Sequence, residues 1–99
     1  KTTVHGRYFS VHAASNSLEF CRLGLTVSRR VSKKAVQRNR IKRQIRESFR
    51  LNQAGFAELG IALDYVVVCK AGGAQQDTRV LREEIDSMWA RTNQKCKNI

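Results

Sequence analysis

Residues 29–50 read RRVSKKAVQRNRIKRQIRESFR and contain the feature around which the rest of the chain is organised. They hold ten of the nineteen Lys and Arg residues of the chain and only one acid, Glu47. Hydrophobic residues recur here at helical spacing, so we predict a helix over residues 34–51, with Ser32 as its N-cap. The core-facing side of this helix should carry Ile41, Ile45 and Phe49, with Ser48 at its edge.

Three further segments have the residue pattern of strands, and these are residues 7–14, 18–28 and 64–70. Alternation in the first segment predicts that Phe9, Val11 and Ala13 face the core. The third segment is hydrophobic on both faces, which favours a central or buried strand. A loop is expected between the predicted helix and this strand.

A final helix is predicted over about residues 78–94, with Asp77 as its cap. Its core face should carry Val80, Leu81, Ile85, Met88, Trp89 and Thr92. The order strand, strand, helix, strand, helix predicts one α+β domain over residues 1–99. We expect a ribosomal-protein-like two-layer sandwich, with helices on one face of a single mixed sheet. The other face should stay open and carry Tyr8, Ser10, His12 and Thr26.

The charge of the chain is its most informative bulk property. Nineteen Lys and Arg residues against eight Asp and Glu residues give a net charge of +11. An excess of this size on a small domain indicates a polyanionic partner, which is a nucleic acid, an acidic protein or an anionic membrane. No apolar run approaches the roughly 20 residues of a membrane span, so we expect no membrane partner.

The cysteines and histidines do not form a recognisable chemical site. Cys21, Cys69 and Cys96 are odd in number and widely spaced, unlike a disulfide framework or a zinc site. We expect reduced thiols in a reducing cytoplasm. His5 and His12 could in principle act as a general acid and base, but an RNA-contacting role is favoured. We therefore expect no catalytic residue and no metal ligand.

The charged face of the predicted helix points to a nucleic-acid partner. On a helical wheel an arc of about 100° contains Asn39, Lys42, Arg43, Arg46 and Arg50, a group that we call the basic stripe. Like charges at this spacing destabilise an isolated helix by about 0.2–0.5 kcal/mol per pair, so a partner that relieves the repulsion is expected. Arginine is suited to this role because its planar fork binds phosphate oxygens bidentately. Arg38 should emerge beside the core stripe, near the sheet edge.

The run from Lys33 to Arg43, KKAVQRNRIKR, with RESFR at residues 46–50, resembles the signature of the bacterial ribonuclease P protein. The likeness extends to Gly6–Phe9 and Gly24–Ser28 upstream and to Asp64–Val68 and Leu81–Trp89 downstream. It implies an accessory subunit of ribonuclease P, whose catalytic RNA uses Mg²⁺ to remove the 5′ leader of precursor tRNA in the bacterial cytoplasm. The Mg²⁺ would be held by the RNA, and no protein partner would be required.

The resemblance also implies roles for individual residues. Contacts with the catalytic RNA fall on Arg30, Lys34, Arg38, Asn39, Arg40, Lys42, Arg43, Arg46 and Arg50. The leader of the precursor would lie on the open sheet face, at Ser10, His12 and Thr26, with Tyr8 on the same side. The family fold also implies a left-handed strand–helix–strand crossover, although right-handed crossovers are the general rule.

Two departures from the family pattern bear on the leader site. The family has a helix before the Gly6–Phe9 segment that forms one wall of the leader cleft, and we expect that wall to be missing from a chain that starts at Lys1. His12 stands where some relatives have an aromatic residue. Two other functions stay open from the residues alone: a structural RNA-binding protein of the ribosomal type, and a self-sufficient nuclease.

Overall fold

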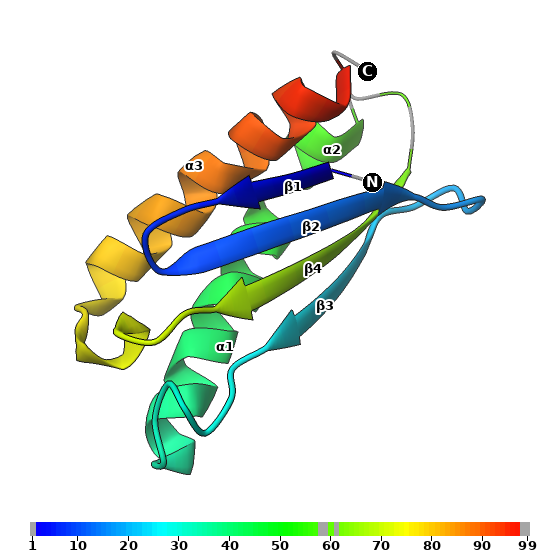
Figure 1. Cartoon of the computed structure of the whole chain (residues 1–99). Helices are drawn as coiled ribbons and strands as arrows, with labels where there is room; N and C mark the ends of the chain where they lie inside the picture. The colour runs from blue at the N-terminus through cyan, green and yellow to red at the C-terminus, as the bar shows by residue number, and fades with distance from the viewer. Residues whose placement is uncertain (1, 58–59, 61, 98–99) are drawn as a thin grey trace.

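The computed structural model describes residues 2–57, 60 and 62–97 and arranges them as a sheet with helices on one of its faces (Figure 1). The elements are β1 (Thr2–His5), β2 (Phe9–Ser15), β3 (Arg22–Thr26), α1 (Ala35–Leu51), α2 (Gln53–Ala57), β4 (Leu63–Cys69), the 3₁₀ turn η1 (Gly73–Gln75) and α3 (Thr78–Lys97). Within these residues the sheet has four strands in the order β1-β2-β4-β3. The predicted α+β class, with one mixed sheet and one open face, is confirmed.

The sheet combines two antiparallel pairs with one parallel pair. β2 pairs antiparallel with β1 and with β4, whereas β3 runs parallel to β4. The hydrophobic strand β4 is therefore central, as predicted. In Figure 1 the chain leaves β3, passes behind the sheet through α1 and returns in β4 as a left-handed crossover. This is the uncommon hand that the family resemblance implied.

The alternation of β2 places its residues as predicted. Phe9, Val11 and Ala13 are at most 2% exposed, and their cross-strand partners on β4 are Cys69, Val67 and Tyr65. These side chains belong to one buried cluster with residues of α1 and α3, so the core lies between the sheet and the helices (Figure 1). The opposite face is left for contacts outside the chain.

Aromatic rings fill the centre of the core at the α2 end of the sheet. The rings of Phe49, Phe56, Tyr65 and Trp89 lie with their centroids 5.0–6.1 Å apart. Ser48 is fully buried, rather than at the edge of the stripe, and its hydroxyl accepts the indole N–H of Trp89 at 2.7 Å. The hydroxyl of Ser48 also donates to Asp86. These bonds fix α1 against α3.

Two elements were not predicted from the sequence. β1 forms at residues 2–5 and pairs with β2, so that Thr3 faces His12 and His5 faces Ser10. α2 forms within the segment expected to be a loop. The second predicted strand is shorter than expected, since Asn16 accepts the backbone N–H of Leu18 in a turn that precedes β3.

The ends of the helices differ from the predictions in detail. Lys34, and not Ser32, occupies the N-cap position of α1, although the Ser32 hydroxyl accepts the backbone N–H of Lys34 at 3.1 Å. Asp77 does accept a backbone N–H of the first turn of α3, from Arg79 at 3.4 Å. α3 runs to Lys97. Its core face is as predicted except for Val80, which lies at the surface.

Candidate nucleic-acid interface

The basic stripe of α1 lies on the side of the helix that faces away from the core. Asn39, Arg43, Arg46 and Arg50 are exposed and Lys42 is half-buried. Glu47 binds Arg50 at 2.7 Å, so this one arginine is already paired with a carboxylate. Within the described part of the chain, no hydrogen bond or ion pair engages the side chains of Lys42, Arg43 and Arg46. Three cations of the stripe are therefore available to a polyanion.

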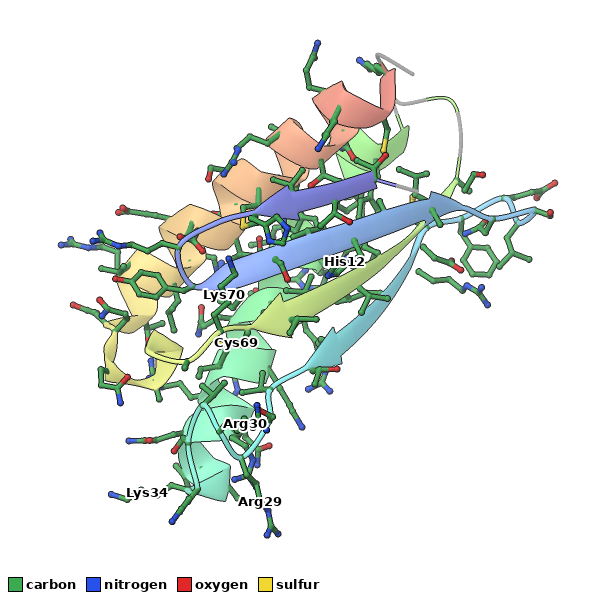
Figure 2. All side chains as sticks on the ribbon, in the orientation of Figure 1. His12, Arg29, Arg30, Lys34, Cys69 and Lys70 are labelled. Carbon is green, nitrogen blue, oxygen red and sulfur yellow. The ribbon has the colours of Figure 1, made fainter. Side chains whose placement is uncertain are left out.

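More cations extend the stripe toward the start of α1. Figure 2 shows Arg29, Arg30 and Lys34 near one another where the β3–α1 connection enters the helix. All three residues are exposed. The family resemblance implied RNA contacts for Arg30 and Lys34 but not for Arg29, which the density of basic residues in this segment could have identified. The first turn of α1 has no acid, so the positive end of the helix dipole adds to this potential.

Arg38 and Arg40, by contrast, make contacts inside the protein. The guanidinium of Arg38 is half-buried and donates to the carbonyl of Ser32 at 2.9 Å. That of Arg40 donates to the hydroxyl of Thr78 at 2.9 Å and to the carbonyls of Ala74 and Gln76 at 3.3 and 3.4 Å. Arg40 therefore joins α1 to the start of α3 and points away from the stripe.

The open sheet face is centred on His12 of β2 (Figure 2). Its ring is half-buried, with Nδ1 3.2 Å from the Thr3 hydroxyl and Nε2 3.4 Å from the Ser10 hydroxyl. Ser10 is only 6% exposed, so it can orient His12 but offers little surface to a ligand. Thr26 is exposed at the β3 side of the same face.

One exposed apolar side chain, that of Val66, lies on this face, and sequence reasoning did not assign it to the site. Val66 is 43% exposed and lies between His12 on β2 and Gly24 on β3. Because Gly24 has no side chain, Val66 stays uncovered; a Cβ at Gly24 would touch Val66 Cγ2 at 3.8 Å. The sequence could have indicated Val66, because the even-numbered residues of β4 point to the same side of the sheet as Ser10 and His12.

Tyr8 does not belong to the open face, so that prediction is wrong. The residue lies in the turn before β2, and its ring packs against the hydrophobic core. Glu84 of α3 holds this turn by accepting the backbone N–H groups of Arg7, Tyr8 and Phe9 at 3.0, 2.8 and 2.9 Å. The strand alternation begins only at Phe9, which is why parity placed Tyr8 on the wrong side.

The acid on this face is neutralised locally. Arg22 donates two hydrogen bonds to Asp64, at 2.8 and 2.6 Å, and Asn16 donates a third at 2.8 Å. The hydrogen bonds from Arg22 make the largest contribution, followed by that from Asn16, and together they lower the pKa of Asp64 to about 2. The carboxylate therefore stays ionised near neutral pH, but its charge is balanced by Arg22 and does not repel a polyanion.

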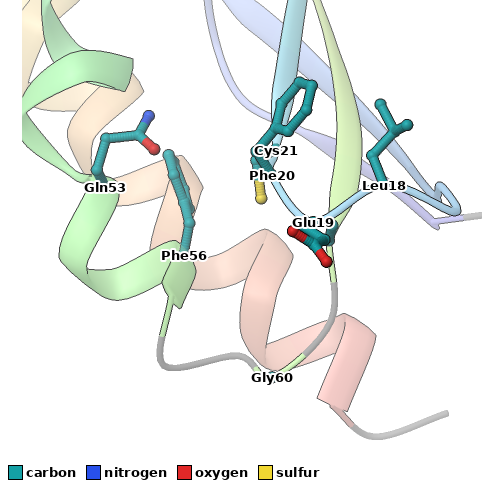
Figure 3. Close-up of a pocket in the computed structure, with 8 residues that line it drawn as sticks. Leu18, Glu19, Phe20, Cys21, Gln53, Phe56 and Gly60 are labelled. Carbon is teal, nitrogen blue, oxygen red and sulfur yellow. The ribbon is translucent and has the colours of Figure 1, made fainter.

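A hollow of about 420 Å³ lies beside the β2–β3 loop (Figure 3). Its lining comprises Leu18, Glu19, Phe20, Cys21, Gln53, Phe56, Gly60 and Ala62. The described residues of the lining include one acid and no cation, so they do not suit a phosphate. In this respect the hollow differs from the surfaces around α1.

No helix in the described part of the chain is long and apolar enough to cross a membrane. No three His, Cys, Asp or Glu side chains among the described residues are grouped so that they could hold a metal ion.

Comparison with known proteins links this arrangement to one family. The family model described as Ribonuclease P matches residues 1–93. A protein of Idiomarina loihiensis named ribonuclease P protein component is 42% identical over 85 residues, which cover 86% of this chain and 65% of the relative. The protein of the same name from Methylococcus capsulatus is 43% identical over 89 residues, with 90% and 66% covered. The chain thus spans just under two thirds of the length of these relatives.

Solved structures show the same fold. The RNase P protein of Staphylococcus aureus superposes with a TM-score of 0.78 at 29% identity, covering 92% of this chain and 82% of that one. The RNase P protein of Thermotoga maritima gives a TM-score of 0.77 at 29% identity, with 91% and 82% covered.

Proposed function

Since the chain belongs to the ribonuclease P protein family, we propose that it is the protein subunit of a bacterial ribonuclease P that matures the 5′ ends of tRNAs. Its partners are a catalytic RNA and precursor tRNA, and it acts in the bacterial cytoplasm. The observation that carries the proposal is the row of cations on α1 without carboxylate partners, beside an open sheet face. Two RNAs can occupy these two surfaces together.

The catalytic RNA binds the α1 side of the molecule. Arg43 and Arg46 are exposed and make no ion pair within the described residues, so binding RNA does not require breaking one. Asn39, on the same face, can donate to and accept from a base edge or a 2′-hydroxyl. Arg30 and Lys34 extend the contact at the start of the helix. Arg40 and Arg38 support this surface through their internal hydrogen bonds.

The 5′ leader of the precursor lies across the open face. The imidazole of His12 offers a flat ring, and the adjacent exposed Val66 offers an apolar surface for a base. Thr26 adds a hydroxyl at the far side. None of these groups requires a particular base, which suits leaders of differing sequence.

The protein contributes to catalysis by reducing the electrostatic repulsion between the two RNAs and by positioning the substrate. Cleavage is carried out by the RNA with Mg²⁺ that the RNA holds, and no side chain of this chain acts as a catalyst. The cations of α1 reduce the repulsion between the two RNAs. Mg²⁺ sites in the RNA then fill at lower Mg²⁺ concentration.

Cleavage of a precursor tRNA at low Mg²⁺ tests this function. We expect the protein alone to be inert, the cognate RNA alone to be slow, and the mixture to be faster than the RNA. Cleavage by the protein alone would instead support a self-sufficient nuclease. A mixture no faster than the RNA alone would support a structural RNA-binding protein.

A further inference from the structure

Cations flank the open sheet face on both sides, and the proposed function uses only one flank. α1 contacts β3 at one edge of the sheet, whereas α3 contacts β1 at the other (Figure 1). At this second edge Arg91 and Lys95 of α3 reach β1. We infer that Arg91 and Lys95 form a second RNA-binding ridge, which binds the backbone of the 5′ leader where it leaves the open face. This inference rests on the proposed function.

Both side chains are positioned by the edge strand. Arg91 Nη2 lies 3.3 Å from the carbonyl oxygen of His5, and Lys95 Nζ lies 2.8 Å from that of Thr3. Each contact occupies one N–H donor, so the other donors of both groups remain for a ligand. Both residues are exposed. Because they are four residues apart, their Cα atoms lie on one side of the helix and about 6 Å apart along its axis.

No carboxylate in the described residues pairs with this ridge. Glu84 lies on the same side of α3, two helical turns before Arg91, but its oxygens accept the backbone N–H groups of the β1–β2 turn. The surface between Ala90, Arg91, Gln94 and Lys95 is a shallow open hollow of about 530 Å³. It has no aromatic side chain on which a base could stack. The chemistry therefore favours phosphate over a base.

The ridge is continuous with the open face. Thr3 and His5 are paired with His12 and Ser10, and their side chains project from the same side of the sheet. With strands about 4.8 Å apart, β1 and β3 are separated by only about 14 Å. A single strand bound at His12 and Val66 therefore reaches Arg91 and Lys95 within a few nucleotides.

The same contacts also have a structural consequence that a test must separate. Arg91 and Lys95 cover the outward carbonyls of an edge strand, which protects that edge from pairing with another chain. Replacement of both by Gln removes the two charges but keeps an N–H donor at each position. The matched control is Arg79→Gln with Lys97→Gln, which removes two charges from exposed positions of α3 that make no described side-chain contact with β1.

The experiment measures the affinity of the reconstituted holoenzyme for precursor tRNAs with leaders of increasing length. At about 0.15 M salt we expect the Arg91→Gln/Lys95→Gln variant to bind long-leader substrate on the order of tenfold more weakly. The slope of log K against log salt should become shallower by about 1.4, since each contact with a single strand contributes about 0.7. Substrates with the shortest leaders and the control variant should behave as the parent.

Equal affinity of the variant and the parent for all leaders would overturn the ridge, as would an equal loss in the control variant. Thermal unfolding of the free protein shows whether the double variant is folded. If the double variant is not folded, the single variant Lys95→Gln is measured in its place, and the slope of log K against log salt should then change by about 0.7. If the parent protein does not increase the rate at which the RNA cleaves precursor tRNA, the proposed function is wrong. If the parent protein increases the cleavage rate and the Arg91→Gln/Lys95→Gln variant has the same affinity for long-leader substrate, only the inference about the ridge is wrong.

Discussion

The guanidinium of Arg40 donates a hydrogen bond to the hydroxyl of Thr78 at 2.9 Å and thereby ties the second turn of α1 to the first residue of α3. The same group donates to the carbonyls of Ala74 and Gln76. Arg40 thus closes the connection between β4 and α3, whereas Arg43, three residues later, is exposed to solvent. Neighbouring arginines of one helix therefore have different tasks.

Replacing Arg40 by Ala should lower stability, because three acceptors lose a charged donor at once. We expect a loss of about 1–3 kcal/mol in the free energy of unfolding, measured by urea denaturation. Arg43→Ala is the matched control and should stay within about 0.5 kcal/mol of the parent. A stable Arg40→Ala protein that binds RNA weakly would instead place this side chain at the RNA surface.

Ser48 and Trp89 give a second test of the core. Ser48→Ala leaves the buried indole N–H without its acceptor. An unpaired buried donor costs about 1–3 kcal/mol, so guanidinium unfolding followed by Trp89 fluorescence should show a loss in this range. Ser87→Ala, at an exposed site on α3, should change stability by less than about 0.5 kcal/mol. Equal effects of the two substitutions would contradict the described hydrogen bond.

The pair of Asp64 and Arg22 predicts an acid-dependent contribution to stability. The pKa of Asp64 is held at about 2, below its ordinary value of 3.8, mainly by the hydrogen bonds from Arg22. A carboxylate with a lower pKa in the folded state stabilises the fold above about pH 4 and loses this effect as the pH falls toward 2. In Arg22→Ala the pKa of Asp64, followed by NMR titration, should move up toward 3.8. An unchanged titration would show that Arg22 does not set it.

His12 is the test of the leader site. His12→Ala removes the ring that lies between the Thr3 and Ser10 hydroxyls on the open face. We expect a higher KM of the holoenzyme for precursor tRNA with a long leader and little change in kcat, because the residue binds substrate without taking part in the chemistry. Leaderless tRNA bound to the holoenzyme is the control. If its affinity falls by the same factor, the residue does not contact the leader.

Periodicity was sufficient for the sheet and helix faces, because alternation and helical spacing follow directly from backbone geometry. It placed Phe9, Val11, Ile41 and Ile45 in the core and Arg43 on the surface, as the structure shows. β1 was not predicted because a strand of four residues is too short to show a clear alternation of hydrophobic and polar residues. The strand is held by its pairing with β2 and by Lys95, 92 residues away from Thr3 in sequence.

The positions of long side chains could not be read from the sequence. A helical wheel gives the direction of the Cα–Cβ bond, but the end of an arginine can turn toward any acceptor within reach. Arg40 donates to a backbone carbonyl in the segment before α3, and Arg50 forms an ion pair with Glu47. Tyr8 shows a related limit of pattern reasoning, since Glu84 holds the turn that interrupts the strand alternation.

The most direct test is the affinity of the protein for its cognate catalytic RNA, measured over a range of salt concentrations. If the free cations of the basic stripe, together with Arg29, Arg30 and Lys34, neutralise about five phosphates, the slope of log K against log salt should be about −4 to −5. Arg43→Ala with Arg46→Ala should make the slope shallower by about two without loss of the folded circular-dichroism signal. A slope near −1 in the parent, or a double variant with an unchanged slope, would contradict the assignment of the basic face of α1 as the RNA contact.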